Sequence, residues 1–230
     1  MKTTPFTIER AENVLMNATE ALENATTKNR MCITAWLDLL GFSQHLNSDF
    51  FDFDTESNLG LKRIATFHEI SLQSMNDISH IVQLNDATIF SYDIKGTNIV
   101  AELSEFFARL DSFWEIANLS DKKIGGYGVR GVISLGYRYN LRGNFGWTPN
   151  NMNVKDPNFI SPTPIMMNMS FAKSYYLESS KKLRRESSLY IESRILTDFQ
   201  FQIMETWEEH EKIFDEKVGE YTLIRYENEP

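Results

Sequence analysis

A chain of 230 residues with 42% hydrophobic and 13% aromatic content can bury a core of its own, which excludes a disordered protein. Its formal net charge of −9 argues against a protein that binds nucleic acid non-specifically. The sequence has one cysteine, no signal-peptide pattern and no apolar run approaching the roughly 18 residues of a membrane span. We therefore expect a cytoplasmic protein with no nucleic-acid partner and no membrane partner.

The first 29 residues are expected to form a helix that precedes the core. Between Thr7 and Thr26, alanine, valine and leucine recur at spacings of three and four residues, which is the pattern of an amphipathic helix. We assign residues 1–29 to this helix and 30–192 to the main domain. Residues 193–230 are expected to add a helix and a strand to the same domain.

The segment Met31–Leu37 is a continuous apolar run, which is typical of a strand covered on both faces. It leads directly into Asp38, a carboxylate whose burial is costly unless another group pairs with it. Gly41 permits a tight turn after the strand, with backbone N–H groups that can hold an anion. Two interpretations are open: Asp38 caps a following helix, or it belongs to a functional site.

A hairpin with a carboxylate at its tip follows a second helix, which is expected at about residues 58–77. Residues 78–84 and 87–92 are rich in strand-forming side chains, and Asn85 and Asp86 separate them. Both of these residue types tolerate the backbone of a two-residue turn. Asp86 is therefore expected at the hairpin tip, where an aspartate is also an ordinary turn residue.

The remaining sequence predicts a sheet with helices packed on one of its faces. Further helices are expected at about 97–118, 164–179 and 195–211, and further strands at about 127–139, 189–191 and 221–226. In the helix at 164–179, the residues expected to face inward are Ile165, Met169, Ala172, Tyr176 and Leu177. This order predicts an α+β fold in the ferredoxin-like style, with a central, mostly antiparallel sheet. The first strand then lies beside the hairpin, which puts Asp38 and Asp86 at the same end.

Two carboxylates at neighbouring strand ends are suited to hold Mg²⁺ or Mn²⁺, which prefer oxygen ligands. A pair of such ions about 3.5–4 Å apart clamps the attacking and leaving oxygens of an in-line displacement. The expected substrate is a nucleoside triphosphate, because the metal ions offset its negative charge. Without these ions, an acidic protein would repel it. The sequence contains no P-loop motif.

Four segments together resemble the class III nucleotidyl cyclase homology domain: LDLLGF, the hairpin LNDATIF, the strand VRGVISLG and a helix that ends in LES. The family pattern is D-x-x-G-F, a G-D hairpin tip, a G-x-x-x-G strand and a helix reading N-x-x-x-R-L-E-S. The resemblance covers roughly residues 30–192. It implies that Asp38 and Asp86 are catalytic and ligate two Mn²⁺ or Mg²⁺ ions, together with the carbonyl of Leu39. The backbone expected to cradle the triphosphate is that of Leu40, Gly41 and Phe42.

The sequence departs from the family at positions that act on the ribose and the base. Alignment on Leu177–Ser179 puts Ala172 and Tyr176 where the family has an asparagine and an arginine, and the purine-selecting positions fall near Val82 and Ile165. Two functions therefore stay open. The chain is a divergent cyclase that acts on UTP or CTP, or it is a catalytically inactive homologue that binds a nucleotide or a protein partner.

In length, stand-alone architecture and its R-G-x-I-x-x-G strand, the chain is similar to the compact bacterial pyrimidine cyclases of antiphage defence, which make cyclic UMP or cyclic CMP as an alarm signal. In the class III family two protomers pair head to tail, so the resemblance to that family implies a homodimer with composite active sites. The loop at 141–160, rich in Gly, Asn and Pro, is a candidate for function or for a dimer contact. Arg130 then contacts phosphate or base, and the alternative is an ordinary surface ion pair. Lys173, Tyr175 and Tyr176 line the partner's site, or they are dimer or core contacts.

Two related enzyme classes are disfavoured by the sequence. A diguanylate cyclase should carry a G-G-D/E-E-F hairpin, which LNDATIF lacks. A palm-type polymerase should carry a basic face for its template, and the net charge of −9 argues against one. The resemblance to the pyrimidine cyclases implies UTP as the expected substrate.

Overall fold

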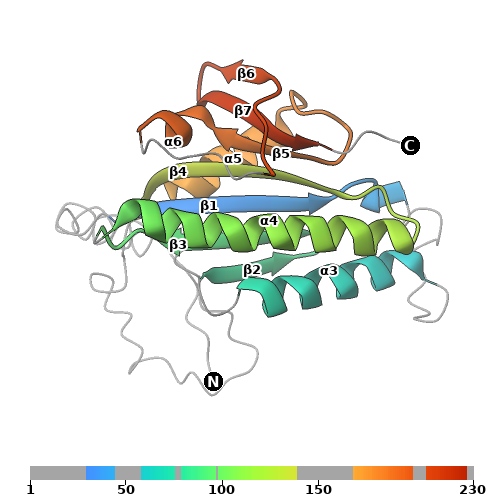
Figure 1. The fold of residues 1–230 in the computed structure, drawn as a ribbon. Coiled ribbons are helices and arrows are strands. Elements are labelled where there is room, and N and C mark those ends of the chain that lie inside the picture. Colours follow the sequence, from blue (N-terminus) through green and yellow to red (C-terminus); the bar gives the residue numbers. More distant parts are fainter. Residues whose placement is uncertain are drawn as a thin grey trace, which may run out of the picture.

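A seven-stranded sheet organises the chain (Figure 1) in the computed structural model, which describes residues 30–44, 58–75, 79–96, 98–138, 168–198 and 206–226. The strands are β1 (Arg30–Leu39), β2 (His80–Leu84), β3 (Ala87–Asp93), β4 (Val129–Arg138), β5 (Ser188–Glu192), β6 (Lys212–Asp215) and β7 (Gly219–Tyr226). They lie in the order β2-β3-β1-β4-β5-β7-β6. Every neighbouring pair is antiparallel except β4 and β5. This confirms the expected mostly antiparallel sheet of an α+β fold, with the hairpin β2–β3 beside β1.

Helices cover both faces of this sheet. α3 (Leu59–Met75) and α4 (Ile99–Lys123) lie side by side on one face, whereas α5 (Met169–Ser179) packs on β1 and β4 from the other face (Figure 1). The expectation that all helices pack on one face was wrong. Alternate residues of β1 point to opposite faces of the sheet, and each face is packed against a different helix. Ile33 and Leu37 belong to the core under α4, whereas the Thr34 hydroxyl bonds to Ser170 of α5 at 2.7 Å.

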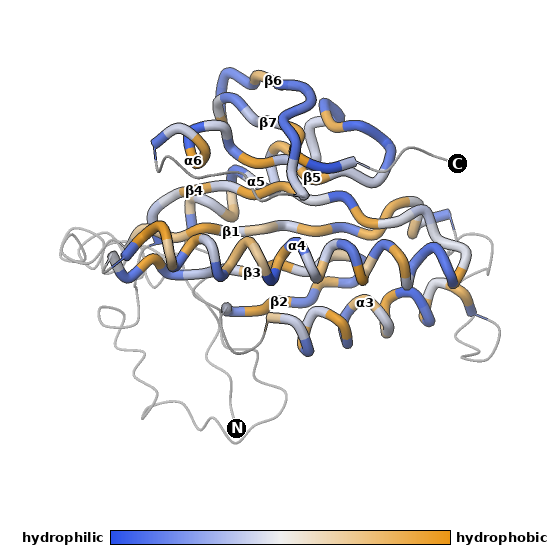
Figure 2. Tube along the Cα trace, viewed as in Figure 1, coloured by the Kyte–Doolittle hydropathy of each residue, from blue (hydrophilic) through white to orange (hydrophobic). Residues whose placement is uncertain are grey.

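The core between α3, α4 and the sheet is built mainly from aromatic side chains. Phe67 of α3, Phe113 of α4 and Phe90 of β3 are buried, and the rings of Phe90 and Phe113 meet edge to face at 4.9 Å. Figure 2 shows apolar residues recurring along α4 between hydrophilic ones, as expected for a helix that buries one stripe. Each such buried ring contributes about 1.5–3 kcal/mol, so this core is a main source of stability.

Small polar side chains hold α5 against the sheet. Ser174 Oγ donates to Ser134 Oγ of β4 at 2.8 Å, one turn after the contact of Ser170 with Thr34. The helix also approaches β4 very closely, because a Cβ added to Gly136 would lie 2.6 Å from the backbone nitrogen of Ser170. The position of α5 is therefore set by hydroxyl contacts and close backbone packing.

The inward face of α5 differs from the expected one. Met169 and Ala172 are exposed, whereas Ser170, Ser174 and Leu177 are buried. The expectation for Met169 and Ala172 was wrong because polar groups on β1 and β4 attract the serine face of the helix. Leu177 faces inward as predicted, and Tyr176 is half-buried.

The C-terminal part also differs from the sequence-based expectation. A helix was expected at 195–211, but α6 (Ser193–Asp198) is short, and residues 206–211 are not helical and hydrogen-bond to β7. Trp207 Nε1 and Arg225 Nη1 donate to the buried Asp111 of α4 at 2.7 and 2.6 Å, which ties this segment to the core. Strand β6, which was not predicted, follows and continues the sheet. Three predicted features lie outside the described residues: the helix within 1–29, the loop at 141–160 and Ile165.

Within the part of the chain that the structure describes, no helix has both the length and the apolar character needed to cross a membrane.

Candidate functional site

The end of β1 and the tip of the β2–β3 hairpin meet at one edge of the sheet. Asp38, near the end of β1, pairs in register with Ala87 of β3. The next residue, Leu39, donates its backbone N–H to the carbonyl of Asp86 at 2.9 Å. Asn85 at the tip has a positive φ of 39°, as a two-residue turn requires. The structure therefore brings Asp38 and Asp86 together at the same end, as the predicted strand order required.

Burial and nearby negative charge raise the pKa of both acids above its ordinary value. Burial raises the pKa of Asp38 to about 8, the carboxylates of Asp86 and Glu178 add to the rise, and Arg130 and Arg63 oppose it. The pKa of Asp86 is also raised, first by burial and then by Glu178. Such an arrangement is unfavourable for two anions alone and becomes favourable when a cation stands between them.

The donor set fits a hard divalent cation. Carboxylate and carbonyl oxygens are the ligands that Mg²⁺ and Mn²⁺ prefer, and Asp38 and Asp86 lie together at one edge. The contribution of the Leu39 carbonyl stays a prediction. No group of three or more His, Cys, Asp or Glu side chains in the described ranges is arranged to hold a metal ion. A divalent ion at this edge would therefore need further oxygen ligands from outside the described residues.

A closed ring of hydrogen bonds fixes the backbone just after Asp38. Arg63 Nη2 donates to the carbonyl of Leu40 at 2.7 Å, and the N–H of Leu40 donates to the carbonyl of Gly128 at 2.9 Å. The N–H of Gly128 donates to Asp121 Oδ2 at 2.8 Å, and Asp121 in turn accepts Arg63 Nε and Nη2 at 2.7 and 2.9 Å. We call these four residues the Leu40 clamp. Both polar groups of the Leu40 backbone are held, so the loop that carries the carboxylate has little freedom.

Sequence reasoning missed the charged members of the clamp, although one signal was present. Arg63 lies on the inward stripe of α3 with Phe67 and Met75, and its side chain is fully buried. A charged residue on such a stripe indicates a buried partner. That partner, Asp121, lies 58 residues away in sequence, so only the fold reveals the pair.

The clamp also changes the expected anion cradle. The backbone of Leu40 was expected to hold a triphosphate, but its N–H is already bonded to the carbonyl of Gly128. Gly41 has a φ of +65°, and a Cβ there would lie 2.4 Å from the ring of Tyr127. Glycine is therefore required at this turn, and the contribution of Gly41 and Phe42 to a cradle stays a prediction.

Arg130 lies beside the two acids and is paired with a residue that sequence reasoning did not single out. It is the partner of Asp38 in the β1–β4 register, and its Nη2 lies 4.0 Å from Asp38 Oδ2. The same nitrogen bonds to Glu178 near the end of α5, while Nη1 donates to the carbonyl of Arg184 at 3.2 Å. The ion-pair alternative for Arg130 thus describes the observed state, and a contact to phosphate or base stays a prediction.

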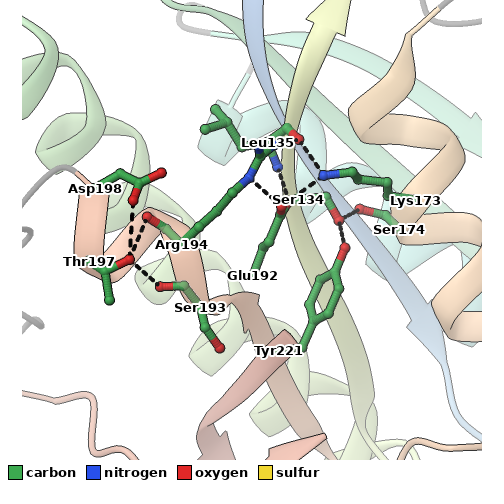
Figure 3. Close-up of polar contacts among 10 residues, drawn as sticks. All are labelled: Ser134, Leu135, Lys173, Ser174, Glu192, Ser193, Arg194, Thr197, Asp198 and Tyr221. Atoms are coloured by element: carbon green, nitrogen blue, oxygen red, sulfur yellow. Dashed lines mark hydrogen bonds and ion pairs between the residues drawn. The ribbon is translucent and has the colours of Figure 1, made fainter. Parts of the chain in front are cut away.

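The α5 residues expected to line a partner's site have different surroundings. Lys173 Nζ binds Glu192 Oε1 at 2.7 Å, and Figure 3 shows both in one polar cluster. Tyr176 lies against its own chain, with Lys217 Nζ 5.1 Å from its ring centroid. Tyr175 is 51% exposed and its ring lies 5.2 Å from that of Trp36. Of these three residues, Tyr175 is the one with an open ring surface.

Comparison with known proteins reveals a likeness in fold. The sequence matches no protein-family model and no curated protein. A solved structure of a bacterial light-regulated adenylyl cyclase superposes with a TM-score of 0.50 at 10% identity, over 96% of this chain and 66% of that one. The adenylyl cyclase CyaB from P. aeruginosa gives a TM-score of 0.48 at 12% identity, over 86% of this chain and 95% of that one.

A guanylate cyclase domain of RhGC from Catenaria anguillulae, solved in complex with GTP, gives a TM-score of 0.47 at 10% identity over 88% of this chain and all of that one. We take the fold from the light-regulated enzyme, whose TM-score is the highest of these three. The chain has the fold of a class III cyclase domain. At 10% identity, this likeness establishes the fold and not the activity.

We predict that Asp121→Asn weakens the fold strongly, because it leaves the fully buried Arg63 without a charge partner. Breaking a buried ion pair costs about 3–5 kcal/mol, so the urea midpoint should fall clearly. Glu115→Gln, an exposed change on the same helix, should shift stability by less than about 0.5 kcal/mol. Equal urea midpoints for Asp121→Asn and the wild type would contradict the role of the clamp.

We also predict a pH-dependent effect of Asp38→Asn on stability when a chelator removes divalent ions. Folding raises the pKa of Asp38 from its ordinary 3.8 to about 8, so wild-type stability falls as pH rises between these values. Asn cannot titrate, so the melting temperature of Asp38→Asn should exceed that of the wild type by an amount that grows from about pH 5 to pH 8.5. The exposed control Asp198→Asn should show no such trend. A constant difference across this range would refute the raised pKa.

Proposed function

We propose that the protein is a nucleotide cyclase, which converts a nucleoside triphosphate into its 3′,5′-cyclic monophosphate and pyrophosphate. The observation that carries the proposal is the meeting of Asp38 and Asp86 at one edge of the sheet, both with a raised pKa. The fold supports it, because the light-regulated structure with the same fold is an adenylyl cyclase. A structural protein would gain nothing from two partly buried acids at one edge.

In this proposal the chain's residues orient the substrate for an in-line displacement. The ribose 3′-hydroxyl loses its proton to water as its oxygen forms a bond to the α-phosphorus, and the bond from that phosphorus to the bridging oxygen breaks as pyrophosphate leaves. Asp38, Asp86 and the Leu39 carbonyl would hold two Mn²⁺ or Mg²⁺ ions, which offset the phosphate charge and lower the pKa of the 3′-hydroxyl. The backbone at Gly41 and Phe42 would orient the triphosphate, while the Leu40 clamp keeps that loop in place.

The proposed base is a pyrimidine, with UTP before CTP. Val82 of β2 is half-buried against an apolar cluster that includes Trp36 and Ile89. An apolar lining offers no hydrogen bonds to the edge of a purine, so selection has to come from the size of the site. The exposed ring of Tyr175 is available to narrow it, whereas Tyr176 packs on its own chain. The cyclic product would then serve as an alarm signal in antiviral defence.

The active form in this proposal is a cytoplasmic homodimer with two composite sites. Support comes from α5, on which Met169, Ala172 and Tyr175 are exposed. A second copy of the chain could cover this partly apolar surface in a two-fold dimer.

A second candidate is a catalytically inactive homologue that binds a nucleotide or a protein partner. The replacement of the family's asparagine and arginine by Ala172 and Tyr176 favours it, and so does Arg130, which is paired with Glu178 in the observed state. Turnover of triphosphates separates the two candidates directly.

We predict that Asp86→Asn, which keeps the side-chain volume, lowers cyclase turnover at least about a hundredfold, because catalytic metal ions supply several kcal/mol of charge stabilisation. The measurement is product formation by mass spectrometry after incubation with Mn²⁺ and a triphosphate. Asp198→Asn on the surface of α6 is the matched control and should keep full turnover. Normal cyclisation by Asp86→Asn would reduce Asp86 to a turn residue and contradict the mechanism.

We predict that UTP or CTP is cyclised at least about tenfold more efficiently than ATP or GTP, a margin of roughly 1.4 kcal/mol. Tyr175→Ala should erode this preference, because it widens the site for a two-ring base. Tyr137→Ala is the matched control: Tyr137 is 52% exposed, as Tyr175 is 51%, but it lies toward the opposite end of β4 from Arg130. Efficient ATP cyclisation without UTP or CTP turnover would refute the pyrimidine assignment, and no turnover at all would favour the inactive homologue.

A further inference from the structure

We infer that Glu178 is a positioning residue that keeps Arg130 off Asp38 and so keeps the metal-binding acids available. The inference rests on the proposed function, because it assigns Asp38 to a divalent metal site. It concerns a contact that the sequence did not indicate: the bond from Arg130 to the end of α5.

The position of Arg130 on the sheet favours a direct ion pair with Asp38. The two residues are cross-strand partners in the antiparallel β1–β4 ladder, and such partners have Cβ atoms about 4.5–5.5 Å apart on the same face. A guanidinium at that distance can form a bidentate pair with a carboxylate. The observed Nη2 lies 4.0 Å from Asp38 Oδ2, which is beyond hydrogen-bond distance.

Two contacts draw Arg130 away from that pair. Nη2 donates to Glu178 Oε1, and Nη1 donates to the carbonyl of Arg184 at 3.2 Å. The side chains of Arg130 and Glu178 are each only 16% exposed, so water screens their attraction weakly. Arg130 Nε has no hydrogen-bond partner among the described residues, so Nη1 and Nη2 make the observed hydrogen bonds of the guanidinium.

The carboxylate of Glu178 is held in place by the docking of α5. Leu177 is buried in the cluster formed by Val132 and Tyr190, and Ser174, one turn before Glu178, bonds to Ser134. Glu178 is therefore presented from a fixed helix and can hold a flexible arginine at a defined point.

This arrangement has a direct consequence for metal binding. A guanidinium bonded to Asp38 would occupy the carboxylate oxygens that a divalent ion needs, and its charge would repel that ion. If Glu178 loses its charge, Arg130 is free to bind Asp38 instead. The loss should therefore weaken metal binding through Arg130, in addition to the small effect of removing one nearby negative charge.

A double-mutant cycle on Mn²⁺ affinity tests this with the full-length protein and no substrate, by electron paramagnetic resonance of free Mn²⁺. Glu178→Gln should weaken Mn²⁺ binding at least about tenfold when Arg130 is present and less than about threefold in the Arg130→Gln background. Arg130→Gln alone should change the affinity less than about threefold, because its guanidinium is already held elsewhere. Glu178→Asp keeps the charge and should restore much of the affinity.

Controls and contrary outcomes separate this inference from the proposed function. Glu186→Gln removes a more exposed acid paired with Arg184 at 3.8 Å and should leave Mn²⁺ affinity unchanged. Thermal unfolding checks that each variant is folded. If Glu178→Gln does not fold, the Mn²⁺ affinity of Arg130→Gln still tests the inference. Equal weakening by Glu178→Gln in both Arg130 backgrounds, or a clear gain of affinity in Arg130→Gln, would overturn this inference alone. Undiminished Mn²⁺ binding by Asp38→Asn would overturn the proposed function and this inference with it.

Discussion

The buried ion pair between Arg63 and Asp121 is the constraint on which the candidate site depends. It links α3 to α4, and through Leu40 and Gly128 it also fixes the loop that follows Asp38. A buried pair of this kind costs desolvation energy and is weak evidence for stability alone. Here Arg63 donates to the Leu40 carbonyl, and Asp121 holds Gly128, whose carbonyl accepts the Leu40 N–H. Arg63 also puts a positive charge near two acids whose pKa values are raised. The positive charge of Arg63 thus partly offsets the cost of placing Asp38 and Asp86 close together.

On the opposite face of the sheet, hydrogen bonds between hydroxyl groups position α5 beside the site. α5 rests on hydroxyl groups of β1 and β4, where an apolar helix face would normally pack. Such contacts are directional, so they fix the position of the helix along β4 and with it the carboxylate of Glu178. Asp38 is therefore set between a clamp from one layer and an ion pair from the other, and both layers act on its charge.

The sequence predicts those features that local patterns encode. The apolar run before Asp38 and the Asn85–Asp86 turn identify β1 and the hairpin, and their adjacency follows from general rules of sheet topology. Strand β6 was missed because the segment before it is held by contacts to Asp111, nearly a hundred residues earlier in the chain. Glu178 was missed as a neighbour of Asp38 for the same reason, since nothing local in LES shows which residue it meets. The serine face of α5 was misjudged because hydroxyl partners on a sheet cannot be recognised by hydrophobic periodicity.

The central claim is that β1 and the hairpin tip bring two acids together to hold divalent ions for a triphosphate. The most direct measurement is a crystal structure of the protein with Mn²⁺ and a non-hydrolysable UTP analogue, with anomalous scattering to locate the manganese. We expect anomalous peaks within about 2.0–2.3 Å of carboxylate oxygens of Asp38 and Asp86, with phosphate oxygens completing the coordination. A bound analogue without manganese at these two residues, or manganese bound elsewhere, would contradict the account.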